Sequence, residues 1–272
     1  MKYILVLLIT GIMVFPVWWM FSGSFQDIEG YYSVPPKLIP SGLHLNNYRL
    51  ILSHPYTLRW VWNTLLVVAG TCTLAIITTT FAGYAFSIYN FRGRNFFFWF
   101  FMAALMIPGS AIIIGQFLVL RAIGIYNTIW AAILPFLFHP FGIFFYKNYV
   151  DSVPRTIIDS ARIDGAGEIR ILRQIVAGMT VPAIGTLIVF MSFGALGNYL
   201  WQNLVLQSIE IKTLLVGMVI QMRSWELIYS LDLDPLSARM AGGVVLMLPA
   251  LFIFIFANKR FIKDLKMGAL TQ

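Results

Sequence analysis

Charged residues are scarce in this sequence. Only 11% of its 272 residues are Asp, Glu, Lys or Arg, and 59% are hydrophobic, whereas about a quarter of the residues in a soluble domain are charged. The mean hydropathy is +0.80. This composition excludes an ordinary soluble domain and indicates an integral membrane protein.

The residue patterns of common enzyme sites are also missing. The chain has one cysteine, Cys72, which excludes an intrachain disulfide and a cysteine-based metal site. It has no Gly-Lys dipeptide and therefore no P-loop, and it has neither His-Glu-x-x-His nor Gly-x-Ser-x-Gly. We expect no catalytic residue, no metal ligand and no cofactor in this chain.

The interiors of the apolar stretches lack Asp, Glu, Lys and Arg, and His139 is the only residue there that titrates near neutrality. An ion-coupled carrier normally needs carboxylates or a charged relay at membrane depth. The sequence therefore argues against a secondary transporter. Because Pro140 follows His139, we interpret this histidine as a polar residue accommodated at a kinked helix, with a proton relay as the alternative.

Six charge-free stretches are long enough to cross a bilayer, which takes about 20 apolar residues. The predicted fold is all-α, a single transmembrane domain over residues 1–272 with helices at 3–22, 62–89, 96–120, 124–146, 176–206 and 240–258. The first stretch has features of a signal peptide, since Lys2 precedes it and Ser22-Gly23-Ser24 follows. Its apolar core has the length of a full span, and Trp18-Trp19 is typical of a membrane interface, which favours a retained helix.

The basic residues are distributed unevenly between the two sets of loops. With the N-terminus inside, the cytoplasmic side holds 12 of the 19 Lys and Arg residues, which are Lys2, Arg92, Arg94, Lys147, Arg155, Arg162, Arg170, Arg173, Lys259, Arg260, Lys263 and Lys266. This asymmetry predicts that both termini are cytoplasmic. The net charge of +8 is spread between apolar runs rather than gathered on one basic face, so we expect no nucleic acid partner.

The most polar internal segment, residues 151–175, falls on the cytoplasmic side in this topology. Its apolar residues recur every three or four positions, as on one side of a helix, and are Ile158, Ala161, Gly165, Ile169, Leu172 and Ile175. Pro154 suits a helix start, and the glycines at 165 and 167 suit a sharp turn before a second helix from Glu168. The segment has nothing of its own in water to cover its apolar side, so we expect a cytosolic protein to bind it. A helix lying on the membrane surface is the alternative.

Two longer segments fall on the outer side. Residues 27–59 are rich in turn residues and predict an irregular loop with a short helix near Asn47–Leu52. In residues 207–239, the stretch Leu214–Met222 is apolar but too short to span. A helix lying on the membrane and a re-entrant turn both fit that stretch.

The end of the fifth predicted span carries three amide residues, Asn198, Gln202 and Asn203, with Trp201 between the first and the second. Amides close to Gly194 and Gly197 suit an interrupted helix that lines a polar path. Ordinary helix packing through glycine is the alternative. We take Asn198, Trp201 and Gln202 as candidate residues of a translocation path.

The spacing within the polar segment resembles a known motif. Asp159-Ser160-Ala161 is followed after three residues by Gly165 and after nine more by Ile175. This pattern is similar to the EAA loop of permease subunits of bacterial ABC importers, and the sequence Ala-Arg-Ile-Asp-Gly-Ala from Ala161 is similar to that of their MalG-type carbohydrate importers. The resemblance extends along nearly the whole chain, through Asn47-Tyr48, Asn63-Thr64, Gly83-Tyr84-Ala85-Phe86, Pro108, Pro182 and Gly268-Ala269.

The resemblance implies a function and a set of partners. The chain would be the membrane subunit of a carbohydrate importer in a bacterial inner membrane. It would work with a second permease subunit, two ATP-binding subunits that hold ATP and Mg, and an extracytoplasmic solute-binding protein. Residues implied to contact the ATP-binding subunits are Asp159, Ser160, Ala161, Asp164 and Gly165, with Gly268 and Ala269 at the tail.

Within that set, the resemblance implies that Asp159 pairs with a basic residue of the partner, that Ala161 packs against it and that Gly165 reverses the chain. Asp159 stands where the family usually has Glu. An ion-coupled secondary transporter and a membrane scaffold without transport activity are the two other functional classes to be tested.

Overall fold

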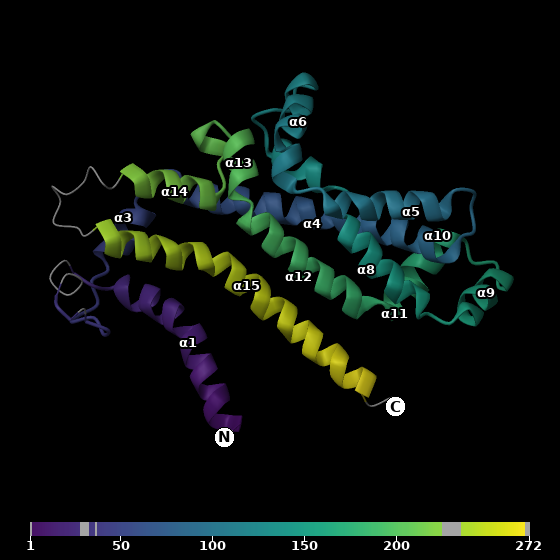
Figure 1. The fold of residues 1–272 in the computed structure, drawn as a ribbon, viewed down its shortest axis with the longest axis horizontal. Coiled ribbons are helices and arrows are strands. Elements are labelled where there is room, and N and C mark those ends of the chain that lie inside the picture. The colour runs from purple at the N-terminus through teal and green to yellow at the C-terminus, as the bar shows by residue number, and fades with distance from the viewer. Residues whose placement is uncertain (1, 28–32, 36, 225–234, 270–272) are drawn as a thin grey trace. The chain divides into compact units, whose positions relative to one another are not determined.

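The computed structural model describes residues 2–27, 33–35, 37–224 and 235–269, and the part of the chain it describes contains helices and no strand (Figure 1). The all-α prediction is confirmed. The chain divides into two compact units, Met1–Thr64 with Ser208–Leu251 and Leu65–Gln207 with Phe252–Gln272.

The first unit contains α1 (Lys2–Gly23), α3 (Asn46–Leu52), the start of α4 (Thr57–Ile88), η4 (Ile209–Ile211), α14 (Leu214–Ser224) and the first part of α15 (Pro235–Ala269). The predicted short helix near Asn47–Leu52 is confirmed as α3. The side chains of α1 are exposed along most of its length, as expected for a helix that faces lipid or another subunit.

The core of the first unit is built around Trp60 at the start of α4. Its indole Nε1 donates to the Ile209 carbonyl at 2.8 Å, and its ring lies so close to Gly217 that an added Cβ would come within 2.3 Å of Trp60 Cδ2. Leu214 and Met218 of α14 are buried in the same cluster as Trp60. The apolar stretch Leu214–Met222 is thus helical, and it forms part of this core.

The second unit contains the rest of α4 and a series of shorter helices. These are α5 (Arg94–Ala103), η1 (Ala104–Met106), α6 (Gly109–Ala122), α7 (Ile129–Ile133), η2 (Leu134–Phe136), α8 (Pro140–Asp151), α9 (Arg155–Ile163), α10 (Glu168–Arg170), the π-helical turn η3 (Ile171–Val176), α11 (Ala177–Met179), α12 (Val181–Gly197) and α13 (Tyr199–Val205). The segment predicted to be a helix, a turn and a second helix is α9 to η3.

The six predicted spans correspond to three continuous helices and three bent pairs of helices. Residues 2–23, 57–88 and 236–255 are each long and apolar enough to cross a membrane. The bent pairs cover residues 94–122, 129–151 and 168–197, with bends of 106°, 48° and 84°, and up to six spans result if each pair is one span. The third pair begins and ends earlier in the chain than the stretch predicted at 176–206. Pro108, Pro140 and Pro182 stand at these breaks, where a missing N–H and a fixed φ interrupt a helix.

Candidate functional site

The turn after α9 has the geometry of a Schellman motif. The Ala166 amide donates to the Ala161 carbonyl at 2.9 Å, and the Gly165 amide donates to the Arg162 carbonyl at 3.0 Å. Gly165 has φ +80°, a left-handed conformation that glycine adopts without steric cost. The predicted sharp turn at Gly165 is confirmed, and it reverses the chain between α9 and α10.

The apolar side of α9 is partly covered by its own chain. Ile158 is only 1% exposed and packs in a cluster with Val150, Val153 and Tyr84, and Leu172 of η3 is buried in the same cluster. The expectation that this side lacks any cover within the chain is therefore wrong, because the ends of α4 and α8 reach it. Burying one isoleucine contributes about 1.5–3 kcal/mol.

The opposite side of α9 remains open. Ile163 is 86% exposed and Ile157 is 40% exposed, and Ser160 and Asp164 are exposed as well. Ala161 is half-buried against the chain's own cluster. Of the residues implied to contact a partner, Asp159, Ser160, Asp164 and Gly165 are thus exposed. Ile163 is exposed as well, although the resemblance did not imply a contact for it.

An ion network ties the two ends of the α9 turn together. Arg162 Nε donates to Glu168 Oε1 at 2.8 Å, and Arg162 Nη1 donates to Asp159 Oδ1 at 3.2 Å. The Tyr84 hydroxyl of α4 donates to Glu168 Oε2 at 2.5 Å. The hydrogen bond from Arg162, opposed by partial burial and helped by Tyr84, lowers the pKa of Glu168 to about 2.

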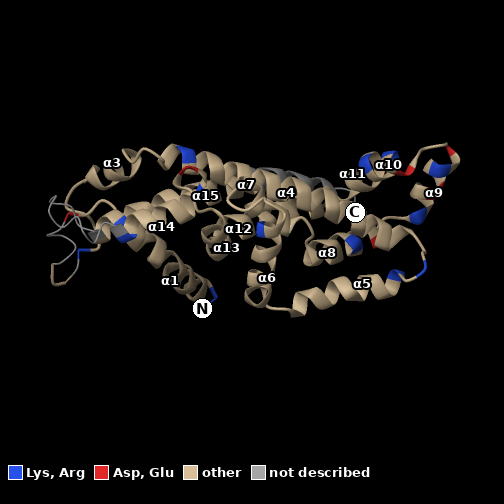
Figure 2. Ribbon diagram, turned by 90° about the horizontal axis from the view of Figure 1, so that it is seen from above, with Lys and Arg blue, Asp and Glu red and all other residues tan. Residues whose placement is uncertain are grey.

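A second polar network lies at the start of α9. The Ser87 hydroxyl of α4 donates to Asp151 Oδ1 at 2.6 Å, and Lys147 Nζ donates to Asp151 Oδ2 at 2.5 Å. Arg155 Nη2 donates to the Ser87 carbonyl at 2.8 Å. Burial alone would raise the pKa of Asp151, but the hydrogen bonds from Lys147 and Ser87 outweigh it and lower that pKa. Figure 2 shows how the charged residues on α9 and α10 contrast with the uncharged length of α12.

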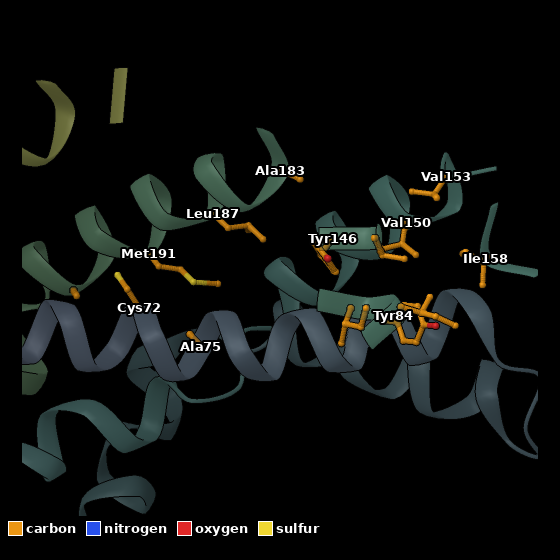
Figure 3. Close-up of a cluster of buried hydrophobic side chains, with 14 of the residues drawn as sticks. Cys72, Ala75, Tyr84, Tyr146, Val150, Val153, Ile158, Ala183, Leu187 and Met191 are labelled. Atoms are coloured by element: carbon orange, nitrogen blue, oxygen red, sulfur yellow. The ribbon is translucent and has the colours of Figure 1, made fainter. Parts of the chain in front are cut away.

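One buried cluster extends from α9 along the second unit. Figure 3 shows it running from Ile158 and Val153 at one end to Ala75 and Met191 at the other. Its members come from α4, α8, α9, η3 and α12. Protein interiors are close-packed, so this cluster joins α9 to α12 through continuous side-chain contact.

The far end of the cluster borders a cleft of about 370 Å³. Four polar residues line it, Thr71, His139, Asn198 and Gln202, and the remaining lining is aromatic or small and aliphatic, formed by Val67, Ala75, Ala132, Phe136, Phe190, Met191, Phe193, Gly194 and Ala195. His139 also caps α8, since its Nδ1 accepts from the Gly142 amide at 3.0 Å. The Thr71 hydroxyl is buried and has no hydrogen-bond partner among the residues that the structure describes.

The three candidate path residues do not share one role. Asn198 lies in the break between α12 and α13 and lines the cleft. Gln202 also lines it, while its Nε2 donates to the Ala195 carbonyl at 2.6 Å. Trp201 is 2% exposed, and its Nε1 donates to the Ala131 carbonyl at 3.0 Å. Trp201 therefore anchors α13 to α7 and does not line the cleft.

The remaining predicted site residues, Gly268 and Ala269, are the last two residues of α15. Sequence reasoning missed Glu168 and Tyr84 beside the α9 turn and Thr71 in the cleft. The motif Gly83-Tyr84-Ala85-Phe86 was the available signal for Tyr84. Within the described residues, no three His, Cys, Asp or Glu side chains gather in a way that would hold a metal ion.

Comparisons with known proteins agree on one family. Residues 73–267 match the family described as binding-protein-dependent transport system inner membrane component. The arabinooligosaccharides transport system permease protein AraQ of Halalkalibacterium halodurans is 30% identical over 96% of this chain and 92% of its own length. The galactooligosaccharides transport system permease protein GanQ of Bacillus subtilis is 27% identical over 98% and 93%.

A solved structure shares the fold. A chain of a bacterial ABC transporter involved in the import of the acidic polysaccharide alginate superimposes with a TM-score of 0.85, covering 96% of this chain and 95% of its own, at 19% identity.

Proposed function

The chain belongs to the family of binding-protein-dependent transport system inner membrane components, and we propose that it forms the membrane path of an ATP-driven importer for an uncharged carbohydrate. The observation that carries this proposal is the single buried cluster that joins α9 to the cleft. A push on α9 then has a packed route to the residues that line the path.

The proposed partners follow from what this chain lacks and what it presents. It has no P-loop, so ATP and Mg would be held by two ATP-binding subunits that dock on the open side of α9, where Ile163 and Asp164 are exposed. A second permease subunit would complete the wall of the path, and an extracytoplasmic binding protein would deliver the solute. Both termini would then lie in the cytoplasm of a bacterial cell.

The lining of the cleft suits a neutral sugar. Phe136, Phe190 and Phe193 offer apolar ring faces, and Asn198 and Thr71 offer hydrogen bonds to hydroxyl groups. Within the described lining there is no Asp, Glu, Lys or Arg, whereas an anionic solute in a site of low polarity needs a charged partner. Thr71 adds to this argument, because a buried hydroxyl without a partner is a group that a ligand hydroxyl would satisfy.

The first experiment tests the class of function. The full-length chain, expressed together with the proposed partner subunits and extracted in a gentle detergent, should co-purify with a P-loop ATPase. Vesicles that contain the complex should take up solute only when ATP is supplied. Uptake driven by an ion gradient without ATP would identify a secondary transporter. A stable complex with neither ATPase nor uptake would identify a scaffold.

The second experiment tests the cleft. Thr71→Val removes the unpartnered hydroxyl at constant volume, and Thr186→Val is the matched control, since Thr186 lies on α12 outside the lining and donates to the Pro182 carbonyl. We expect Thr71→Val to reduce uptake of a neutral oligosaccharide by about tenfold, the equivalent of one hydrogen bond of roughly 1.4 kcal/mol. Equal uptake by both variants would exclude Thr71 from the path.

A further inference from the structure

The end of α4 presents two polar side chains toward the α9 segment. Tyr84 and Ser87 are three residues apart and therefore lie on one side of the helix. Tyr84 reaches the residues that follow α9, and Ser87 reaches those that precede it. The buried Ile158 lies in the same cluster as Tyr84. Helix α9 is thus fixed to α4 at both of its ends.

The Glu168 clamp consists of Tyr84, Arg162 and Glu168. Glu168 accepts from Arg162 Nε at 2.8 Å through one oxygen and from the Tyr84 hydroxyl at 2.5 Å through the other. Both oxygens of the carboxylate are used, by donors from two different helices. Hydrogen bonds with an ionised partner are among the stronger ones in proteins, so this clamp sets the position of the α9 turn relative to α4.

The Asp151 clamp consists of Ser87, Asp151 and Arg155. The Ser87 hydroxyl donates to Asp151 at 2.6 Å, and Arg155 donates to the Ser87 carbonyl at 2.8 Å and to its hydroxyl at 3.3 Å. Ser87 is 3% exposed, whereas the side chains of Asp151 and Arg155 are 36% and 46% exposed. The two clamps hold the two ends of α9 independently.

The route from α4 to the cleft is straight, whereas the covalent route through α12 is not. From Tyr84 to Ala75, which lines the cleft, α4 is one uninterrupted helix, about 13 Å long at 1.5 Å per residue. The chain that leaves α9 toward α12 passes through the π-helical turn η3 and then bends by 84° before α12. Such a bend absorbs displacement, while a continuous helix passes it on.

We propose that the Glu168 and Asp151 clamps make α4 the element through which a movement of α9 opens or closes the cleft, with Glu168 as a positioning residue for coupling. This inference rests on the proposed function. It assigns the coupling movement to two routes, the packed cluster around Ile158 and helix α4. Val67, Thr71 and Ala75 of α4 line the cleft.

The test uses the complete importer with its binding protein in proteoliposomes, and it measures ATP hydrolysed per solute taken up. Glu168→Gln keeps the shape of the side chain and removes its charge. We expect the ATP cost per solute to rise about five- to tenfold, with ATPase subunits still bound. Arg92→Gln, which removes an exposed charge in the loop after α4, is the control and should leave the ratio unchanged.

Two further variants separate positioning from folding. The exchange of charges in Arg162→Glu with Glu168→Arg rebuilds this ion pair, and the Tyr84 hydroxyl accepts from an arginine as well as it donates to a glutamate. Because the exchange also places a carboxylate beside Asp159, coupling should recover only in part, to a value above that of Glu168→Gln. Tyr84→Phe should raise the ATP cost in the same direction as Glu168→Gln, whereas Tyr149→Phe on α8 should not.

The outcomes are distinct. Normal coupling in both Glu168→Gln and Tyr84→Phe overturns the proposal. If Glu168→Gln does not assemble, the ATP hydrolysed per solute by Tyr84→Phe alone tests the proposal, and an unchanged ratio overturns it. Absence of ATP-driven uptake in the unmodified assembly would instead refute the proposed function.

Discussion

Ile158 and Ile163 belong to the same short helix, α9, but their replacement with alanine should have different effects. We expect Ile158→Ala to reduce the local stability of α9 and Ile163→Ala to weaken binding of the ATPase subunit. Ile158 is 1% exposed and packs against the chain's own core, whereas Ile163 is 86% exposed. Replacing a buried isoleucine with alanine costs about 2–5 kcal/mol, through lost burial and the cavity left behind. Replacing an exposed isoleucine in a helix costs nothing and gains a few tenths of a kcal/mol in helix propensity.

The expected effect of Ile158→Ala follows from these values. A loss of about 3 kcal/mol raises the population in which α9 is detached by roughly a hundredfold, at about 1.4 kcal/mol per factor of ten. Because exchange of amide hydrogens reports such local opening, the amides of residues 158–166 in the purified full-length chain should exchange about a hundredfold faster in Ile158→Ala. Ile163→Ala should exchange at the original rate.

Ile163→Ala, which should not change amide exchange, should weaken binding of the ATPase subunit. Ile163→Ala keeps α9 in place but removes the most exposed apolar side chain of its open side, so it should weaken co-purification of the ATPase while local protection is unchanged. Equal protection in Ile158→Ala and the unmodified chain would refute the assignment of Ile158 to the core. Intact ATPase binding by Ile163→Ala would refute the assignment of the open side as the docking face.

Three other changes test separate parts of the structure. Asp159→Lys places a positive charge beside Arg162 and should weaken ATPase binding and uncouple transport, while membrane insertion, checked by protease accessibility, is unaffected. Gly217→Ala would bring a Cβ within 2.3 Å of Trp60 and should destabilise the first unit by about 1–3 kcal/mol, the usual cost of overpacking, lowering the melting temperature in detergent. Because the pKa of Glu168 falls from 4.5 to about 2 on folding, its stabilisation is complete above pH 4.5 and is lost as the pH falls toward 2. Its side chain is 41% exposed, so solvent screening leaves about 1 kcal/mol, measurable as faster amide exchange near residue 165 in acid.

Local patterns in the sequence predicted the local structure of residues 151–175 well. The break at Gly165 was visible because a glycine stands where a helix ends in a left-handed residue. The Glu168 clamp was not visible, because Tyr84 lies 84 residues before Glu168 and periodicity carries no information on contacts between distant segments. The same limit explains why Ile158 seemed to need an external partner.

The spans were predicted by length and composition, and those quantities do not report bends. Prolines 108, 140 and 182 were present in the sequence, yet a proline in a membrane helix gives a kink whose angle depends on how neighbouring helices satisfy the freed backbone groups. The observed bends range from 48° to 106°. A further break, without a proline, contributes to the cleft, because Asn198 stands where α12 gives way to α13 and lines the cleft.

The two acidic residues that share Arg162 differ in how readily they can exchange partners. Asp159 is 62% exposed and meets Arg162 through one contact at 3.2 Å, and an exposed pair of this kind is worth less than about 1 kcal/mol. In the proposed complex, a basic residue of a docking subunit would therefore displace Arg162 from Asp159 at little cost. Glu168 engages both of its oxygens, with Arg162 and with Tyr84, so Arg162 released by Asp159 remains held. Docking through Asp159 would thus leave the Glu168 clamp closed, which is the condition under which our proposal has a pull on α9 reach α4.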